Sequence, residues 1–222
     1  MGDILEIINS RRNVTHFMPK FVSWENISRV LDAGRHAPSC GNIQNWKFIV
    51  ALKPELKQEL AAAAYEQYEI AQAFVLIVVC AEPEKAERYY GEKGKGLYTA
   101  QNCAAAVQNM LLEAHSLGLA TRWIGAFDEE KVKELLTIPA DVEVHTIVAL
   151  GYAKEIPTKP PKYPLETLLY FGTWRGKIAD PAKYLNDIAT ILARKAQTAS
   201  ETIKKGKEFV AGKVKETVGK KN

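Results

Sequence analysis

Four groups of polar residues stand in apolar surroundings and could together bind a charged, planar ligand. The first is Arg11-Arg12-Asn13, which follows an apolar N-terminal segment. The others are Asn42-x-Gln44-x-Trp46, Gly125-Ala126-Phe127-Asp128, and the pair Lys159 and Lys162. Arginines offer paired donors and lysines offer point charges, so these residues could clamp a phosphate. Taken alone, the two arginines favour a simpler interpretation, a solvated helix end.

Other site chemistries find little support. The four histidines have no metal-binding spacing, so we predict no metal site. Cys40, Cys80 and Cys103 share no C-x-x-C spacing and leave one cysteine over, which argues against clusters and secreted disulfides and indicates a reducing compartment. No G-x-S-x-G elbow or Ser-His-Asp order supports nucleophilic catalysis. The glycine-rich segment 91–96 lacks the ending of a P-loop, and we interpret it as a flexible surface loop.

Composition and charge narrow the class of protein. The 222 residues are 47% hydrophobic and 25% charged, as expected of a globular chain that buries a core unaided. The formal net charge of +4 comes from the tail after residue 178, while residues 1–178 are nearly neutral, so a nucleic-acid-binding body is not supported. No apolar run is long enough for a membrane span and no signal peptide is evident, so we expect a cytoplasmic protein.

Hydrophobic periodicity predicts helices alternating with buried strands over residues 1–178, which indicates one domain, an α/β or α+β sandwich with a single mixed sheet. The small residues of the longest helix, 97–117, indicate that another helix packs tightly against it. The expected helices are 4–8, one from Ser23, 54–64, 97–117 and 128–136, the expected strands are 46–50, 74–80, 121–125 and 142–152, and 37–45 is expected to be a loop.

Six segments then occur in an order typical of one family. They are 10–17, 37–46, 64–67, 118–127, 149–152 and 162–166. They are similar to the blocks R-R-S-x-R-x-F, A-P-S-x-x-N-x-Q-P-W, Y-G-Q, G-L-G-x-x-W-I-G-x-F, A-L-G-Y and R-x-P-L-E-E of the FMN-dependent nitroreductase family. The resemblance covers roughly residues 1–170, and agreement of six ordered blocks by chance is improbable.

The resemblance implies a fold and an activity. The fold would be α+β, a three-layer α/β/α sandwich with a mixed central sheet. The C-terminal helical extension that periodicity predicts after residue 178 has no counterpart in the family core. The activity would be hydride transfer from NADH or NADPH to FMN and on to a nitroaromatic, quinone or similar acceptor. The protein would be a homodimer with FMN at the subunit interface, with which the tightly packed helix 97–117 is consistent.

The resemblance also implies residue roles. The segment 11–13 would hold the FMN phosphate and ribityl chain, Lys162 would close the clamp, and the loop 38–42 would line the isoalloxazine of the partner subunit. Gln67 would bond the pyrimidine edge, and the catalytic positions Gly125 and Ala126 would direct N–H groups at the flavin. The full cofactor-binding set is Arg11, Arg12, Asn13, Thr15, Pro38, Ser39, Cys40, Asn42, Gln44, Gln67, Trp123, Ile124, Gly125, Ala126, Lys159 and Lys162.

Four positions depart from the family pattern. Thr15 stands where a cation is usual, so the clamp would depend more on Lys159 or Lys162, and Asn13 replaces a serine. Asn45 replaces a proline, and Asn102 replaces a common aspartate. The last two affect the expected acceptor preference more than cofactor binding.

Two alternatives stay open at this stage. A dehalogenase or flavin-fragmenting enzyme on the same scaffold would share the cofactor residues, and a non-enzymatic flavin-binding protein could act through its tail. The tail, 179–222, has the pattern of basic amphipathic helices. We expect it to dock on the protein rather than to contact a membrane surface, because its apolar stripe is narrow and mostly valine.

Overall fold

The computed structural model of the chain describes residues 3–178. The chain divides after Lys159 into two compact units, and each is described by itself. The expected tail, 179–222, lies outside the described residues, so its helices and the boundary at residue 178 stay predictions. Within the described part, no helix is long and apolar enough to cross a membrane.

A five-stranded sheet forms the centre of the first unit. β5 pairs with β3 along one edge and with β4 and β1 along the other, and β2 follows β3. These pairings are antiparallel, and a parallel bridge joins Asn13 to Thr121. The predicted α+β class with a mixed sheet is confirmed. The strands are β1 (Phe17–Met18), β2 (Trp46–Ala51), β3 (Val75–Ala81), β4 (Ala120–Ile124) and β5 (Glu143–Ala153).

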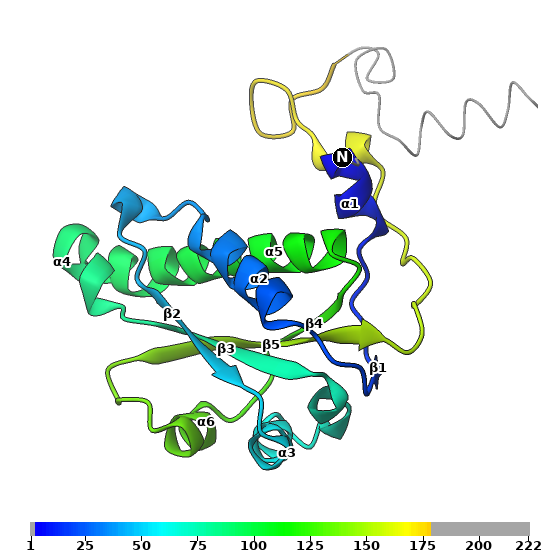
Figure 1. The fold of residues 1–222 in the computed structure, drawn as a ribbon. Helices are drawn as coiled ribbons and strands as arrows, with labels where there is room; N and C mark the ends of the chain where they lie inside the picture. The colour runs from blue at the N-terminus through cyan, green and yellow to red at the C-terminus, as the bar shows by residue number, and fades with distance from the viewer. Residues whose placement is uncertain (1–2, 179–222) are drawn as a thin grey trace, which may run out of the picture. The chain divides into compact units, whose positions relative to one another are not determined.

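The central strand β3 shows why the sheet has a helical layer on each face. Its side chains are all buried and alternate between two hydrophobic clusters, as the two-residue period of a strand requires. Val75, Ile77 and Val79 belong to the cluster shared with α2 (Trp24–Arg35) and α5 (Thr99–Ser116). Leu76 and Val78 belong to the cluster shared with α3 (Pro54–Ala63) and α6 (Glu129–Leu136). Figure 1 shows these helix pairs above and below the sheet, so the predicted three layers are confirmed.

Capping residues that the sequence predicts begin or end several of the helices. The Ser23 hydroxyl accepts a bond from the N–H of Asn26, and the Asp128 carboxylate accepts one from Lys131. Gly118 ends α5 with a φ of +71°. The helices are α1 (Ile4–Ser10), α2 (Trp24–Arg35), α3 (Pro54–Ala63), α4 (Glu84–Lys93), α5 (Thr99–Ser116) and α6 (Glu129–Leu136).

Helix α5 packs closely on α2, which confirms the expectation of a tight helical neighbour. A Cβ atom on Gly34 of α2 would lie 2.8 Å from the Met110 Cε of α5. Met110 is fully buried in the same cluster as Val30 of α2. Because this neighbour belongs to the same chain, the small residues of α5 are no argument for a second subunit.

The interpretation of residues 91–96 as a flexible loop is wrong. Helix α4 extends to Lys93, and a π-helical turn, Gly94–Tyr98, continues directly into α5. Strong helix formers open α4, and a Cβ on Gly94 would clash with the backbone carbonyl of Ala86. Gly94 therefore serves close packing, while Gly91, with a φ of +56°, bends the end of α4.

The described part of the second unit, residues 160–178, is short. It contains a 3₁₀ turn, Leu165–Leu168, and a turn in which the N–H of Phe171 donates to the carbonyl of Gly176 at 3.0 Å. Tyr170 and Trp174 meet edge to face with ring centres 5.0 Å apart.

Candidate functional site

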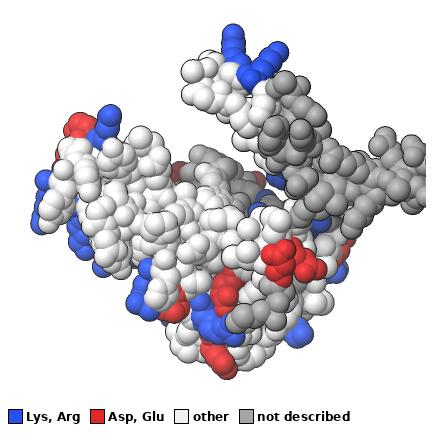
Figure 2. All heavy atoms as spheres, turned by 90° about the horizontal axis from the view of Figure 1, so that it is seen from above, with Lys and Arg blue, Asp and Glu red and all other residues white. Residues whose placement is uncertain are grey.

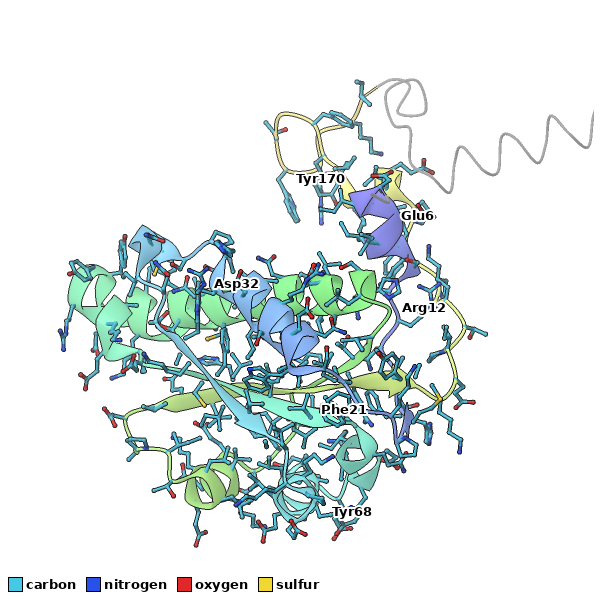
Figure 3. The ribbon with its side chains drawn as sticks, in the orientation of Figure 1. Glu6, Arg12, Phe21, Asp32, Tyr68 and Tyr170 are labelled. Carbon is cyan, nitrogen blue, oxygen red and sulfur yellow. The ribbon has the colours of Figure 1, made fainter. Side chains whose placement is uncertain are left out.

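The predicted phosphate-binding residues lie where α1 meets the C-terminal end of α5. We call Ser10, Arg11, Arg12 and His115 the arginine cluster. The Ser10 hydroxyl and His115 Nε2 are 2.7 Å apart, which joins the end of α1 to the last turns of α5. Figure 3 labels Arg12 at this junction. His115 is 105 residues away from Ser10 in sequence and was not among the predicted site residues.

A cavity of about 290 Å³ opens beside the arginine cluster. Its lining contains two cations and no carboxylate, and its remaining wall is mainly apolar. The lining residues are Ser10, Arg11, Arg12, Val14, His115, Gly118, Leu119, Ala120, Thr121, Ala153 and Ile156. A concave apolar site with a few directed polar groups is the usual form of a small-molecule site.

The charges of the arginine cluster have no acidic partner in the part of the chain that the structure describes. Burial lowers the pKa of Arg11, and the adjacent charge of Arg12 lowers that pKa further. The pKa of His115 is also lowered, first by burial and then by both arginines. Among residues 3–178, no carboxylate forms an ion pair with Arg11 or Arg12. The cavity is therefore positively charged and suited to an anion.

The two arginines differ in what holds them. Arg12 Nη1 donates to the carbonyls of Asn9, Ser10 and Arg11, each at 2.9 Å, so it caps the end of α1. Arg12 Nε is buried and has no protein partner in the described structure. The Arg11 guanidinium donates to no described group, so the whole of it is available for a ligand, while the backbone N–H of Arg11 donates to the carbonyl of Ile7 at 3.1 Å.

Asn13 connects the arginine cluster to β4. Its Oδ1 accepts the N–H of Trp123 at 3.1 Å, and the N–H of Val14 donates to the carbonyl of Thr121 at 3.0 Å. Ile124 is buried, and its carbonyl accepts the Thr146 hydroxyl at 2.7 Å. The structure thus brings the predicted segment 11–13 together with the predicted residues at the end of β4.

Gly125 and Ala126 follow β4 and are exposed. Neither backbone N–H donates to a described residue, so both are available to a ligand. Gln67 holds this segment in place, because its Nε2 donates to the carbonyls of Ala126 at 3.1 Å and Ala64 at 2.7 Å. Its Oε1 accepts Arg122 Nη2 at 2.7 Å. The amide of Gln67 is therefore engaged by the protein, and its predicted bond to the flavin edge stays a prediction.

The loop 37–45 forms a second cluster, apart from the arginines. Gly41, Asn42 and Gln44 have φ values of +52°, +56° and +51°, a left-handed backbone that side chains other than glycine seldom adopt. Such backbone is maintained only by surrounding bonds and is common at functional sites. The Ser39 hydroxyl accepts the N–H of Gln44 at 3.1 Å, and Gln44 Nε2 donates to Asn42 Oδ1 at 3.1 Å.

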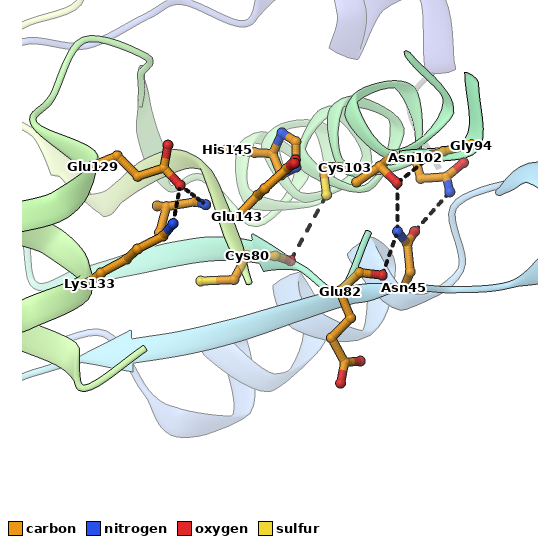
Figure 4. Close-up of polar contacts among 12 residues, drawn as sticks. Asn45, Cys80, Glu82, Gly94, Asn102, Cys103, Glu129, Lys133, Glu143 and His145 are labelled. Atoms are coloured by element: carbon orange, nitrogen blue, oxygen red, sulfur yellow. Dashed lines mark hydrogen bonds and ion pairs between the residues drawn. The ribbon is translucent and has the colours of Figure 1, made fainter. Parts of the chain in front are cut away.

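A buried amide network fixes this loop to the start of α5 (Figure 4). Asn102 Oδ1 accepts the N–H of Cys40 at 2.9 Å, and Asn102 Nδ2 donates to Asn45 Oδ1 at 2.9 Å and to Cys40 Sγ at 3.3 Å. Asn45 Nδ2 donates to Thr99 Oγ1 at 2.9 Å, and Thr99 donates to the Gly94 carbonyl at 2.8 Å. The two departures from the family pattern, Asn45 and Asn102, are thus partners.

The two clusters lie at opposite ends of α5. Asn102 is near the first turn and His115 near the last, and at 1.5 Å per residue this separation is roughly 20 Å. The predicted cofactor residues therefore form two groups within one chain, with α5 between them.

Three predicted residues are not joined to either group. The Thr15 hydroxyl pairs with His16 Nδ1 at 3.0 Å and does not line the arginine cavity. Lys159 is exposed and bonds to no described residue. Lys162 belongs to the second unit, so its role stays a prediction. Residues 3–178 contain no group of three side chains that could hold a metal ion.

Comparison with known proteins finds a matching family model and related sequences. The sequence model of the Nitroreductase family matches residues 8–74 and 61–152. A protein of Archaeoglobus fulgidus, whose name joins NADH dehydrogenase with NAD(P)H nitroreductase, is 34% identical over 159 residues, which cover 70% of this chain and 88% of the relative. The FMN reductase (NADPH) of Bacillus subtilis is 25% identical over 187 residues, 78% of this chain and 75% of its own.

A solved structure agrees with these sequence matches. The crystal structure of a nitroreductase family protein from Clostridium difficile superposes with a TM-score of 0.68 at 27% sequence identity. The match covers 78% of this chain and all of the crystallised one.

Proposed function

The chain belongs to the nitroreductase family, and we propose that it is an FMN-dependent oxidoreductase that carries electrons from NADH or NADPH to a nitroaromatic, quinone or similar acceptor. One observation of the structure carries the proposal. Arg11 and Arg12 form a half-buried pair of cations without a carboxylate, beside a cavity that suits an anionic group. A phosphate dianion is the ligand that such paired donors bind best.

The hydrogen-bond donors among the described residues suit the two polar parts of FMN, its phosphate and its flavin ring. The buried Nε of Arg12, which lacks a protein partner, and the free guanidinium of Arg11 suit a phosphate. The open N–H groups of Gly125 and Ala126 suit the polar edge of a flavin ring. These two donor sets are connected through Asn13 and β4.

The chemistry that bound FMN supplies is hydride acceptance from the nicotinamide and reduction of the acceptor. Conversion of a nitro group to a nitroso group consumes one NAD(P)H and one proton and releases NAD(P)⁺ and water. The chain's residues would bind and orient the cofactor: Arg11 and Arg12 would hold its phosphate, and the N–H of Gly125 would donate to the polar edge of the ring. No side chain need act as a general acid or base.

A homodimer is part of the proposal, and the separation of the two clusters supports it. The arginine cluster and the loop 37–45 contact opposite ends of α5, roughly 20 Å apart, which disfavours one site built from Arg11 and Asn42 of the same chain. A second copy could present its own loop 38–44 to the arginine cluster of the first. We also place the protein in the cytoplasm, a proposal that the three free cysteines support.

The absorption spectrum of the purified protein tests the proposed function. We expect a flavin spectrum that bleaches when NADH or NADPH is added without oxygen and returns when a quinone or nitroaromatic follows. Flavin colour that NADH and NADPH both leave unbleached would contradict the oxidoreductase and favour a binding protein.

Mixed dimers test the shared site. Arg11→Ala and Asn42→Ala would each damage both sites of a homodimer, but a mixed dimer would contain one site with neither change. After mixing equal amounts and subunit exchange, about half of the dimers are mixed and each has one intact site of two, so we expect activity to recover toward roughly a quarter of that of the wild-type protein. Exchange that is verified by mass spectrometry yet restores nothing would refute the shared site.

A further inference from the structure

A second cavity lies between the loop 37–45 and α4. Its volume is about 480 Å³, which suits one substituted aromatic ring better than a whole dinucleotide. The lining is Gly41, Asn42, Ile43, Lys85, Arg88, Tyr89 and Tyr90. It shares Asn42 with the predicted flavin wall, so a molecule bound here would be adjacent to that wall.

The lining of this cavity carries two positive charges and no negative one. Lys85 is neutralised outside the cavity, because it pairs with the Glu82 carboxylate, which also lies 3.5 Å from Lys47. The Arg88 side chain forms no ion pair with any carboxylate in the described part of the chain. In Figure 2, basic side chains gather at the left edge of the molecule, the side on which Figure 1 places α4.

Acidic neighbours on α4 do not neutralise Arg88. Glu84 is one turn earlier, yet the two do not form an ion pair. Glu92 is one turn later, but the left-handed backbone of Gly91 interrupts the helix between them. Among the described residues, Arg88 therefore remains an unpaired cation on the wall of the cavity.

Two tyrosines give this cavity aromatic walls of different rigidity. Tyr90 is held edge-on against Tyr98, with ring centres 5.4 Å apart, and its hydroxyl contacts Gly41, where a Cβ would lie only 2.6 Å away. Tyr89 is 75% exposed and makes no ring contact in the described structure. A planar ring can stack on such side chains while Arg88 pairs with its anionic substituent.

We propose that this cavity binds the anionic group of a small aromatic acceptor and that Arg88 selects for it. The inference rests on the proposed oxidoreductase function and deepens it, because it assigns a substrate class, aromatic nitro compounds or quinones that carry a carboxylate. Arg88 is a specificity residue here: it contacts the substituent and leaves the reacting group to the flavin.

The test compares two acceptors that differ in charge, 4-nitrobenzoate and neutral 4-nitrobenzamide, on the FMN-loaded enzyme. We expect Arg88→Gln to lower the ratio of their kcat/KM values, anionic over neutral, about fivefold, the size of a partly exposed charge contact. The difference between the wild-type protein and the variant should shrink in high salt. Lys93→Gln removes the same charge from the same helix but does not line the cavity, so its ratio should match the wild type.

The acceptor ratios of the two variants decide whether Arg88 binds the anionic group. A ratio that Arg88→Gln leaves unchanged, or that Lys93→Gln lowers equally, overturns it. If the wild-type protein reduces neither of these acceptors nor a quinone, the proposed function fails, while the cavity can still be judged by calorimetric titration with 4-nitrobenzoate. Weaker binding to Arg88→Gln than to Lys93→Gln would then support the anion site, and equal binding, or none to the wild type, would overturn it.

Discussion

At the C-terminal end of α5, Arg11 and Arg12 carry charges that no described carboxylate balances, whereas at its N-terminal end Asn45, Thr99 and Asn102 are neutral and bonded to one another. The second group is almost completely buried, at 0%, 0% and 4% exposure. The arginine cluster is only half-buried. The same helix therefore supports one cluster that is incomplete without a ligand and one that is complete without it.

The difference separates binding from positioning. Unpaired, partly desolvated charges lower the stability of the ligand-free protein, and a bound anion compensates them. A buried amide network with its bonds made instead fixes the geometry of the backbone around it. The comparison predicts that changes at the N-terminal end of α5 act first on stability, and that changes at the arginine cluster act first on ligand affinity.

The largest effect on stability is expected for Asn102→Ala. This change leaves the buried Asn45 Oδ1 and the N–H of Cys40 without partners, and each unsatisfied group costs roughly 1–3 kcal/mol. We expect the free energy of unfolding of the flavin-free protein to fall by about 2–4 kcal/mol in urea titrations. Gln101→Ala, at the exposed neighbouring position of α5, is the matched control and should change it little. Equal stability of the two variants would show that the network does not hold the loop.

Next in size is the loss of flavin affinity in Arg11→Ala. Removing a charged partner of a phosphate costs about 1.5–3 kcal/mol, or roughly ten- to a hundredfold in Kd. Because the Arg11 side chain bonds to no described group and Arg11→Ala keeps the backbone bond to Ile7, the melting temperature of the flavin-free protein should not fall. Fluorescence titration with FMN and thermal melts of the apoprotein measure the two quantities.

Arg12→Ala sharpens this prediction, because Arg12 caps α1 through three carbonyls. We expect it to lower both flavin affinity and apoprotein stability. Identical profiles for Arg11→Ala and Arg12→Ala would remove the distinction between a ligand-binding and a capping arginine.

Local pattern and long-range contact also differ in how far the sequence predicts them. The run at 74–80 is uniformly apolar, so a doubly covered strand and the layers around it follow from local pattern. The bond between Asn45 and Asn102 joins residues 57 apart and leaves no periodic signal. The sequence showed both as departures from the family pattern but not as partners. Likewise, Arg11 and Arg12 stand out in the sequence, while His115, which completes their pocket, does not.

The smallest expected effect concerns the pH dependence of stability at His115. Burial and the two arginines lower its pKa in the folded protein below the ordinary value near 6.5. The unfolded chain then binds a proton more readily than the folded one, so stability rises with pH between the folded pKa and about 6.5 and falls on acidification through that window. His145, whose pKa burial also lowers, contributes in the same direction.

The variant His115→Gln isolates the contribution of His115, because His145 is present in both proteins. We expect the melting temperature of the apoprotein to fall less between pH 7 and pH 5 in His115→Gln than in the wild type. A bound anion should reduce the difference, since it offsets the two arginine charges that disfavour protonation of His115. Melts with and without inorganic phosphate measure this. The same pH dependence in both proteins would show that the charges of Arg11 and Arg12 do not lower the pKa of His115. The cavity would then be less suited to an anion than its lining indicates.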